Sequence, residues 1–315
     1  MDKKEYTVTD ALDGLRLDKA ALTLASNVSR AQMKKAIATG AVRVNGRSCP
    51  KGAPVAKGDV ISILADRVED RDEAAVASPG APLSVLYESE KIIVVDKPAG
   101  QPTAPLRTKE EGTLANALLG RYPELLHVGY NPREPGLLHR LDTDTSGLVV
   151  AARSASVFET LKAALKAGRI VKRYKLLCAA EGLPGHGSIE FGLASHPKDQ
   201  RRVYACVHPR DVARYAPRPA RTDYKVERVA GPWALVEVSV SKALRHQIRA
   251  HFAAIDHPLA GDTLYGGKPI PGVSRHALHA SFVGFDGEGE VEPFHVSSPL
   301  PEILEGLLHE APLGT

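Results

Sequence analysis

The chain opens with apolar positions at helical spacing. They are Leu15, Leu17, Ala20, Ala21 and Leu24. This spacing predicts one amphipathic helix, and a second is predicted between an N-cap at Ser29 and a stop at Gly40. Residues 42–44 then alternate apolar and polar, the Asn-Gly pair after them signals a tight turn, and residues 60–63 predict another strand. Residues 15–64 are therefore expected to form a small α+β unit.

From Leu83 the pattern changes to strands separated by short helices. The β-branched run 91–96 predicts a buried strand. One apolar face predicts a helix over 157–167, ended by Gly168. Further strands are predicted at 172–179, 233–240 and from Leu278, and further helices at 113–119 and within 242–251.

A charged and then Pro/Gly-rich stretch, residues 66–82, separates these two parts and is typical of a linker. A length of 315 residues also favours about two domains over one core. We therefore expect a front domain over 1–65, a linker over 66–82 and a larger domain over 83–315.

Composition limits the classes of function. The hydrophobic content of 43% is ordinary for a globular protein, and no apolar run approaches the roughly 18 residues that span a bilayer. The N-terminus lacks the apolar segment of a secretory signal. The three cysteines lie far apart without metal or redox spacing, which favours a reducing compartment. We expect a cytoplasmic monomer with no membrane partner, and the net charge of +4 is compatible with RNA binding.

Candidate chemistry is concentrated in residues 139–147, His-Arg-Leu-Asp-Thr-Asp-Thr-Ser-Gly, which run into the apolar segment 148–152. Small turn-forming residues place Asp142 on a loop edge with a predicted buried strand behind it. That position suits a nucleophile or a general base. Taken alone, Asp142 and Asp144 also fit ordinary turn formers.

Cations gather in the front unit. They are Arg30, Lys34, Lys35, Arg43 and Arg47. No aromatic residue lies among them, so we expect them to contact phosphates and not bases, unless they form only a solvated face. The order of Arg16-Leu17-Asp18-Lys19, Ser29-Arg30, Val42, Val44-Asn45-Gly46 and Gly58-Asp59 resembles the alpha-L RNA-binding domain. The resemblance implies a small α+β domain that binds RNA.

The larger part, from Leu83 to about Leu307, resembles the RluA-type pseudouridine synthases. The resemblance rests on Lys97-Pro98-Ala99-Gly100, His139-Arg140-Leu141-Asp142, Thr145-Ser146-Gly147, Tyr174, His246-Gln247-Ile248-Arg249, Gly261-Asp262, Tyr265-Gly266 and Leu278-His279-Ala280, in the family's order. It implies an α+β fold with a mixed, mainly antiparallel sheet and flanking helices. It also implies an isomerase that acts on uridine in RNA and needs no metal or other cofactor.

The resemblance implies catalytic roles for Asp142, Tyr174 and Arg249. Asp142 either attacks C1′ or removes the C2′ proton, and a carboxylate with an ordinary pKa of about 3.9 is ionised for either task. Arg249 holds that carboxylate, and Tyr174 stacks on the flipped uracil. A phenol with a pKa of about 10 is a poor unaided base, which makes Tyr174 a weak candidate for removing the C5 proton.

Several other residues are expected to contact RNA. Arg140 either fills the space that the flipped base leaves or pairs with a neighbouring carboxylate. The full set of expected substrate-binding residues is His139, Arg140, His246, Gln247, Arg30, Lys34, Lys35 and Arg43. Ala243 and Leu244 depart from the family's usual Gly-Arg, which affects RNA binding more than chemistry. The basic segment 197–219 either adds phosphate contacts or is a solvated loop.

Three rival functions are weaker. Residues 142–145 match the Asp-x-Asp-x-Thr signature of haloacid-dehalogenase phosphatases, but polar residues interrupt the required strand and no later acidic pair follows. The histidine pairs 246/251 and 276/279 lack the partners of a zinc site. A non-catalytic RNA-binding protein would not need all three catalytic residues.

The alpha-L resemblance favours large-subunit ribosomal RNA over transfer RNA as the target.

Overall fold

The computed structural model of the chain describes residues 3–25, 28, 30–64, 74–107 and 109–309. The chain divides into two compact units, Met1–Ala74 and Ala75–Thr315, which are described separately below. Within the described ranges, no helix is both long and apolar enough to cross a bilayer.

The small unit packs two helices against an antiparallel sheet in the order β1-β3-β2. Its elements are β1 (Lys3–Thr7), η1 (Asp10–Leu12), α1 (Leu17–Leu24), α2 (Arg30–Ala38), β2 (Val42–Val44) and β3 (Val60–Leu64). Leu17, Met33 and Ile61 are completely enclosed in its core. The predicted turn is present, because Asn45 and Gly46 both have positive φ angles, 50° and 76°. The predicted N-cap Ser29 lies outside the described residues.

Residues 66–82, the expected linker, belong in part to the larger unit. Its first residues, 66–73, lie outside the described part of the chain. From Ala75 onward the segment belongs to the larger unit. Ala75 is buried and donates a backbone hydrogen bond to Pro132 O (3.0 Å), and Asn116 Nδ2 donates to Val76 O (2.7 Å). These contacts attach residues 75–82 to the larger unit, although their small and Pro/Gly-rich composition is typical of a linker.

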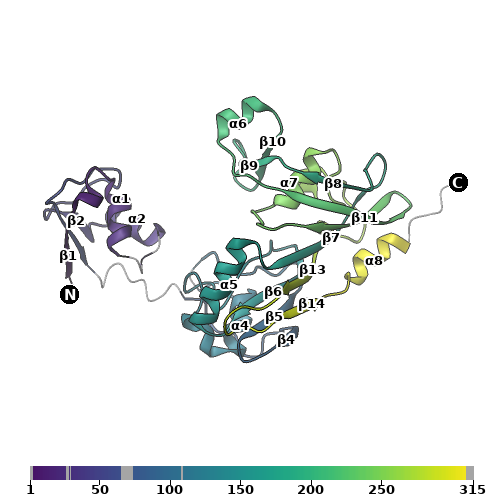
Figure 1. Cartoon of the computed structure of the whole chain (residues 1–315), viewed down its shortest axis with the longest axis horizontal. Helices are drawn as coiled ribbons and strands as arrows, with labels where there is room; N and C mark the ends of the chain where they lie inside the picture. The colour runs from purple at the N-terminus through teal and green to yellow at the C-terminus, as the bar shows by residue number, and fades with distance from the viewer. Residues whose placement is uncertain (1–2, 26–27, 29, 65–73, 108, 310–315) are drawn as a thin grey trace. The chain divides into compact units, whose positions relative to one another are not determined.

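The larger unit is built on a sheet in the order β4-β5-β6-β13-β7-β12-β11-β8, with β14 added beside β13 (Figure 1). The strands are β4 (Val85–Glu88), β5 (Ile92–Lys97), β6 (Ser146–Ala152), β7 (Val171–Ala179), β8 (His186–Ile189), β11 (Thr222–Ala230), β12 (Trp233–Ser239), β13 (Leu278–Phe285) and β14 (Phe294–Ser297). Neighbouring strands are antiparallel except β6 and β13, which run parallel. The sheet is therefore mixed and mainly antiparallel, as the family resemblance implied.

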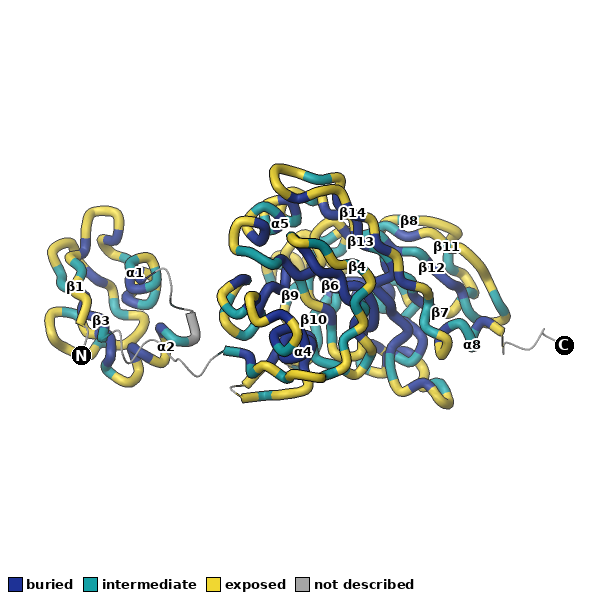
Figure 2. The backbone as a smooth tube through the Cα atoms, turned by 90° about the horizontal axis from the view of Figure 1, so that it is seen from below, coloured by how far each residue is buried: buried dark blue, intermediate teal, exposed yellow. Residues whose placement is uncertain are grey.

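Helices cover both faces of the β5–β6 region. The helices of the larger unit are α4 (Leu114–Arg121), η3 (Pro123–His127), α5 (Ala155–Ala167), α6 (Pro209–Tyr215), α7 (Gln247–Ala254), η4 (Thr263–Tyr265) and α8 (Glu302–His309). Residues of α4 share a core with Ile93 and Val95, whereas residues of α5 share one with Ile92 and Val94. Successive strand residues point to opposite faces, so both faces of β5 are buried. Figure 2 shows the buried segments in dark blue in the interior of the larger unit. The remaining strands, β9 (Gly192–Ser195) and β10 (Val203–Cys206), form a separate hairpin.

Candidate active site

A cleft of about 990 Å³ opens at the centre of the larger unit. Three segments far apart in the sequence line it: the loop that leads into β6, the start of β7, and the loop that leads into α7. The cleft brings together the residues that the sequence singled out in this unit, which are His139, Arg140, Asp142, Tyr174, His246, Gln247 and Arg249.

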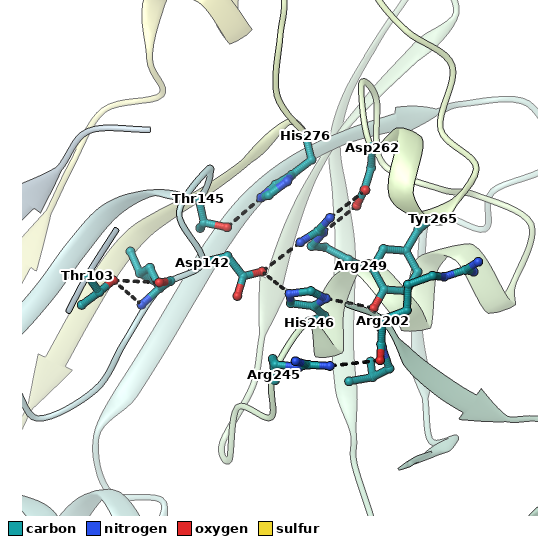
Figure 3. Close-up of polar contacts among 12 residues, drawn as sticks. Thr103, Asp142, Thr145, Arg202, Arg245, His246, Arg249, Asp262, Tyr265 and His276 are labelled. Atoms are coloured by element: carbon teal, nitrogen blue, oxygen red, sulfur yellow. Dashed lines mark hydrogen bonds and ion pairs between the residues drawn. The ribbon is translucent and has the colours of Figure 1, made fainter. Parts of the chain in front are cut away.

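The loop that carries Asp142 is fixed from several sides. Thr103 Oγ1 donates to Leu141 O (2.7 Å) and accepts from Leu141 N (3.2 Å). Completely enclosed Lys97 donates to three carbonyl oxygens, including Thr143 O at 3.0 Å. Thr145 Oγ1 lies 2.8 Å from Nε2 of buried His276 (Figure 3). These contacts restrict the loop before any substrate binds, which is the preorganisation a catalytic group needs.

Arg249 joins two carboxylates. Its Nη1 donates to Asp142 Oδ2 at 3.1 Å, although the two residues are 107 positions apart in the sequence. On its other edge, Nε and Nη2 donate to the two oxygens of Asp262 at 2.7 and 2.8 Å (Figure 3). Asp262 is only 2% exposed, whereas the side chain of Asp142 is 26% exposed to the cleft. Asp262 therefore orients Arg249, and Arg249 presents its remaining donor to Asp142.

His246 is a second neighbour of the Asp142 carboxylate, beside Arg249. It precedes α7 in the left-handed region, with φ of 53°, and its Nε2 lies 3.6 Å from Asp142 Oδ2. Its Nδ1 lies 3.0 Å from the hydroxyl of Tyr265, whose ring also lies under the Arg249 guanidinium at 5.1 Å. Burial lowers the pKa of His246, against the opposing attraction of Asp142. A neutral His246 is therefore favoured near pH 7.

Tyr174 presents its ring to the cleft from the middle of the sheet. Its backbone pairs with Val238 on β12 and Ala280 on β13, and the residue is 6% exposed. Burial, with a smaller contribution from Asp142, raises the pKa of its phenol far above the ordinary value. Tyr174 therefore keeps its proton at neutral pH, which suits a stacking surface better than a base.

Lys172 lies two residues before Tyr174 on the same face of β7 and also lines the cleft. It is 6% exposed, and burial lowers its pKa to about 8. Its charge contributes to lowering the pKa of His139 to about 3, after the larger effect of burial. The two side chains are therefore neighbours in the cleft wall.

Three other residues of the larger unit that were expected to contact substrate make hydrogen bonds or ion pairs within the protein. Arg140 is half exposed and pairs with Glu134 at 2.8 Å, the alternative that the sequence left open for it. His139 Nε2 accepts a hydrogen bond from Val150 N (3.3 Å). Gln247 is buried, its Nε2 donates to Arg221 O (2.8 Å), and its Oε1 accepts from Leu244 N (3.0 Å). His139 and Gln247 therefore hold neighbouring backbone in place and also line the cleft, and their contact with substrate stays a prediction.

The expected RNA contacts also include cations of the small unit. Lys34, Lys35 and Arg43 are exposed in the small unit, and nothing is described of the Arg30 side chain. The basic segment 197–219 spans β10 and α6, and it contributes Arg218 to the cleft lining. Arg202 lies over the Tyr265 ring at 5.2 Å, and Arg201 pairs with Asp199 at 2.9 Å.

Sequence reasoning noted the motifs that contain Lys97, Asp262 and Tyr265 but assigned these residues no role in the site. The signal for Asp262 was an acidic residue inside the turn-rich stretch 261–267, which is too common a pattern to identify a partner for one arginine. The signal for Lys97 was a lysine directly after a buried strand.

Comparisons with known proteins give consistent results. Residues 91–254 match the family model described as RNA pseudouridylate synthase. "Ribosomal large subunit pseudouridine synthase D" of Yersinia pestis is 34% identical over 88% of this chain and 85% of that protein. The protein of the same name from Nitrosomonas europaea is 34% identical over 96% and 86%. The solved structure of "Human RNA Pseudouridylate Synthase Domain Containing 1" covers 75% of this chain and 98% of its own, with a TM-score of 0.55 at 22% identity.

Proposed function

The chain belongs to the RNA pseudouridylate synthase family of isomerases, and we propose that it acts on uridines of large-subunit ribosomal RNA with Asp142 as the catalytic carboxylate. The observation that carries the assignment of Asp142 is its position in the cleft, paired at 3.1 Å with an arginine that a buried aspartate orients. The ribosomal target is supported by the names of the relatives, which refer to the large ribosomal subunit.

The reaction breaks the N1–C1′ bond of uridine, turns the uracil and joins C5 to C1′. The proton on C5 leaves and N1 gains one, so the reaction needs no net oxidant or reductant. Asp142 either attacks C1′ or removes the C2′ proton, and Arg249 orients its carboxylate through the 3.1 Å contact. The flipped base loses its stacking in the RNA, and the ring of Tyr174 replaces part of that interaction, at about 1–3 kcal/mol per base.

The target is tested by offering the purified protein two transcripts under the same conditions, large-subunit ribosomal RNA and a transfer RNA pool. We expect pseudouridine in the ribosomal RNA at a small number of positions, detected by chemical mapping. Modification of transfer RNA alone would contradict the proposed target and leave the activity standing. Absence of pseudouridine in both RNAs would contradict the activity, provided that the protein is shown to bind RNA.

The front unit is proposed to bind the RNA backbone through its exposed cations. Replacing both Lys34 and Lys35 with alanine should weaken RNA binding. The slope of log affinity against log salt should fall by about one to two units, because each phosphate contact contributes about 0.7–0.9. The rate at saturating RNA should change little, since both lysines belong to the small unit and the proposed catalytic residues all belong to the larger one.

A matched control replaces Lys3 and Lys57 of the same unit, which also removes two positive charges. These lysines are exposed and pair with Glu5 (2.6 Å) and Asp10 (2.8 Å). The control should retain nearly the full salt slope. Equal slopes for both double variants would show that net charge matters and that Lys34 and Lys35 form no specific contact.

A further inference from the structure

Lys172 is a buried cation that faces the cleft without a counter-charge. Its residue surface is 6% exposed, and within the described part of the chain no hydrogen bond or ion pair is found for its ammonium group. The ammonium nitrogen has no partner among the described residues, yet it is not among the polar atoms that are both unpartnered and completely enclosed. Part of its surface is therefore accessible, and the residue lines the cleft. Burial is accordingly the one cause identified for the lowered pKa of this group.

The neighbouring cations of the same strand have acidic partners. Arg173 and Lys175 point to the other face of β7, where Arg173 pairs with Glu237 (3.6 Å) and Lys175 pairs with Glu227 (2.9 Å). Arg173 also lies over the Phe282 ring at 4.0 Å. The fold thus gives acidic partners to the two more exposed cations and leaves the more buried one without any among the described residues.

Other cations that line the cleft are either paired or exposed. Arg249 and Arg140 contact carboxylates, and the guanidinium of Arg245 donates to backbone carbonyls. Lys166, Arg218 and Lys242 are exposed at the cleft, where water solvates them. Lys172 differs from both groups, since it has neither a counter-charge nor full solvation in the described structure.

A buried ammonium group without a partner opposes folding, because its charge loses the stabilisation that water gives it. Such a charge is neutralised when an anion enters the cleft with the substrate. Building on the function proposed above, we propose that Lys172 binds a backbone phosphate adjacent to the target uridine. The anionic group of an RNA substrate is the phosphate, and a lysine ammonium binds it as a point charge with several donors.

The position of Lys172 relative to Tyr174 fits this role. Two residues on one face of a strand lie about 6.6 Å apart along it, a separation on the scale of one nucleotide. If the uracil stacks on Tyr174, a phosphate attached to the same nucleotide reaches the neighbouring part of the cleft wall. Lys172 then fixes the flipped nucleotide through its backbone, while Asp142, oriented by Arg249, acts at the sugar.

The first test compares kinetic constants of the full-length protein with those of Lys172→Met, which keeps most of the unbranched side chain and removes the charged end. We expect KM for RNA to rise about ten- to hundredfold, the range of a hydrogen bond to a charged group, with kcat reduced much less. Lys172→Arg should recover most of the loss. The matched control, Lys175→Met on the other face of the same strand, should leave both constants near those of the wild type.

The second test identifies the phosphate. Short RNA substrates carry one uncharged methylphosphonate at successive positions around the target uridine. The wild type should bind one of these substrates about ten- to hundredfold more weakly, whereas Lys172→Met should bind it as well as the unmodified RNA. Equal losses in both proteins at every position would overturn the proposal, as would an unchanged KM for Lys172→Met. A fall in kcat alone with a changed pH profile would also overturn it, and would point to proton transfer.

The urea midpoint of unfolding, measured without RNA, distinguishes a phosphate-binding lysine from one that only stabilises the fold. Lys172→Met should unfold at a higher urea concentration than the wild type at pH 7, because it removes a buried charge that has no partner. A lower midpoint would show that the ammonium stabilises the free protein and would overturn the proposal. Failure of the proposed function is separate, since it would appear as absence of pseudouridine formation by the wild type.

Discussion

Replacing Asp142 with asparagine is expected to abolish pseudouridine formation while leaving the fold and RNA binding intact. Asparagine keeps the shape of the side chain and still accepts a hydrogen bond from Arg249, but it lacks the negative charge that attacks carbon or takes a proton. Loss of a group this central typically lowers the rate by about 10⁴-fold or more. Tritium release from RNA labelled at C5 of uridine measures the rate, and filter binding measures the affinity.

The matched control for this variant is Asp144→Asn. Asp144 lies on the same loop, but it is exposed and is not among the cleft-lining residues, whereas Asp142 faces Arg249 inside the cleft. The control should retain activity within a few-fold of the wild type. Near-normal isomerisation by Asp142→Asn, or an equal loss in both variants, would contradict the assignment of Asp142 as the essential carboxylate.

The contact between Asp142 and Arg249 illustrates what the sequence can and cannot predict about the site. No local pattern relates two residues that are 107 positions apart. Their proximity was expected only because both matched motifs of one family, and the structure contains the expected contact. By contrast, nothing local indicated that the Gln247 amide would bond to the backbone of Arg221 and Leu244, because an amide next to a catalytic motif is equally able to face substrate or backbone.

The elements of the fold were predictable where the hydrophobic pattern is strong. The helix expected over 157–167 is α5, Ala155–Ala167, with Gly168 in the left-handed conformation after it. The run 91–96 became β5, which is buried on both faces and is therefore almost continuously apolar. In these segments local propensity and tertiary packing favour the same structure.

The pattern failed where backbone contacts decide the structure. The strand β1, Lys3–Thr7, is largely polar and exposed, and it exists because its backbone pairs with β3. Residues 75–82 have the composition of a linker, yet backbone and amide hydrogen bonds attach part of them to the larger unit. Such contacts leave little trace in the order of polar and apolar residues.

Replacing Asp262 with asparagine is expected to lower both stability and activity. Asp262 is 2% exposed and accepts two hydrogen bonds from Arg249, so the variant leaves a buried guanidinium with only one carboxylate, Asp142. Removal of one partner from a buried ion pair typically costs about 3–5 kcal/mol of stability. Because Asp142 remains as a counter-charge, we expect a loss near the lower end, about 3 kcal/mol. Urea unfolding at pH 7 measures the loss.

The activity of this variant tests the orienting role of Asp262. An arginine that is no longer held on its inner edge should present Asp142 less accurately, so kcat should fall while KM for RNA changes little, since Asp262 does not line the cleft. The control is Asp286→Asn, which removes a carboxylate whose side chain is 94% exposed in the same unit. That change should alter stability by no more than about 0.5 kcal/mol. Unfolding of Asp262→Asn at the same urea concentration as this control, together with the wild-type kcat, would contradict the prediction. Asp262 would then neither stabilise the fold nor orient Arg249 toward Asp142.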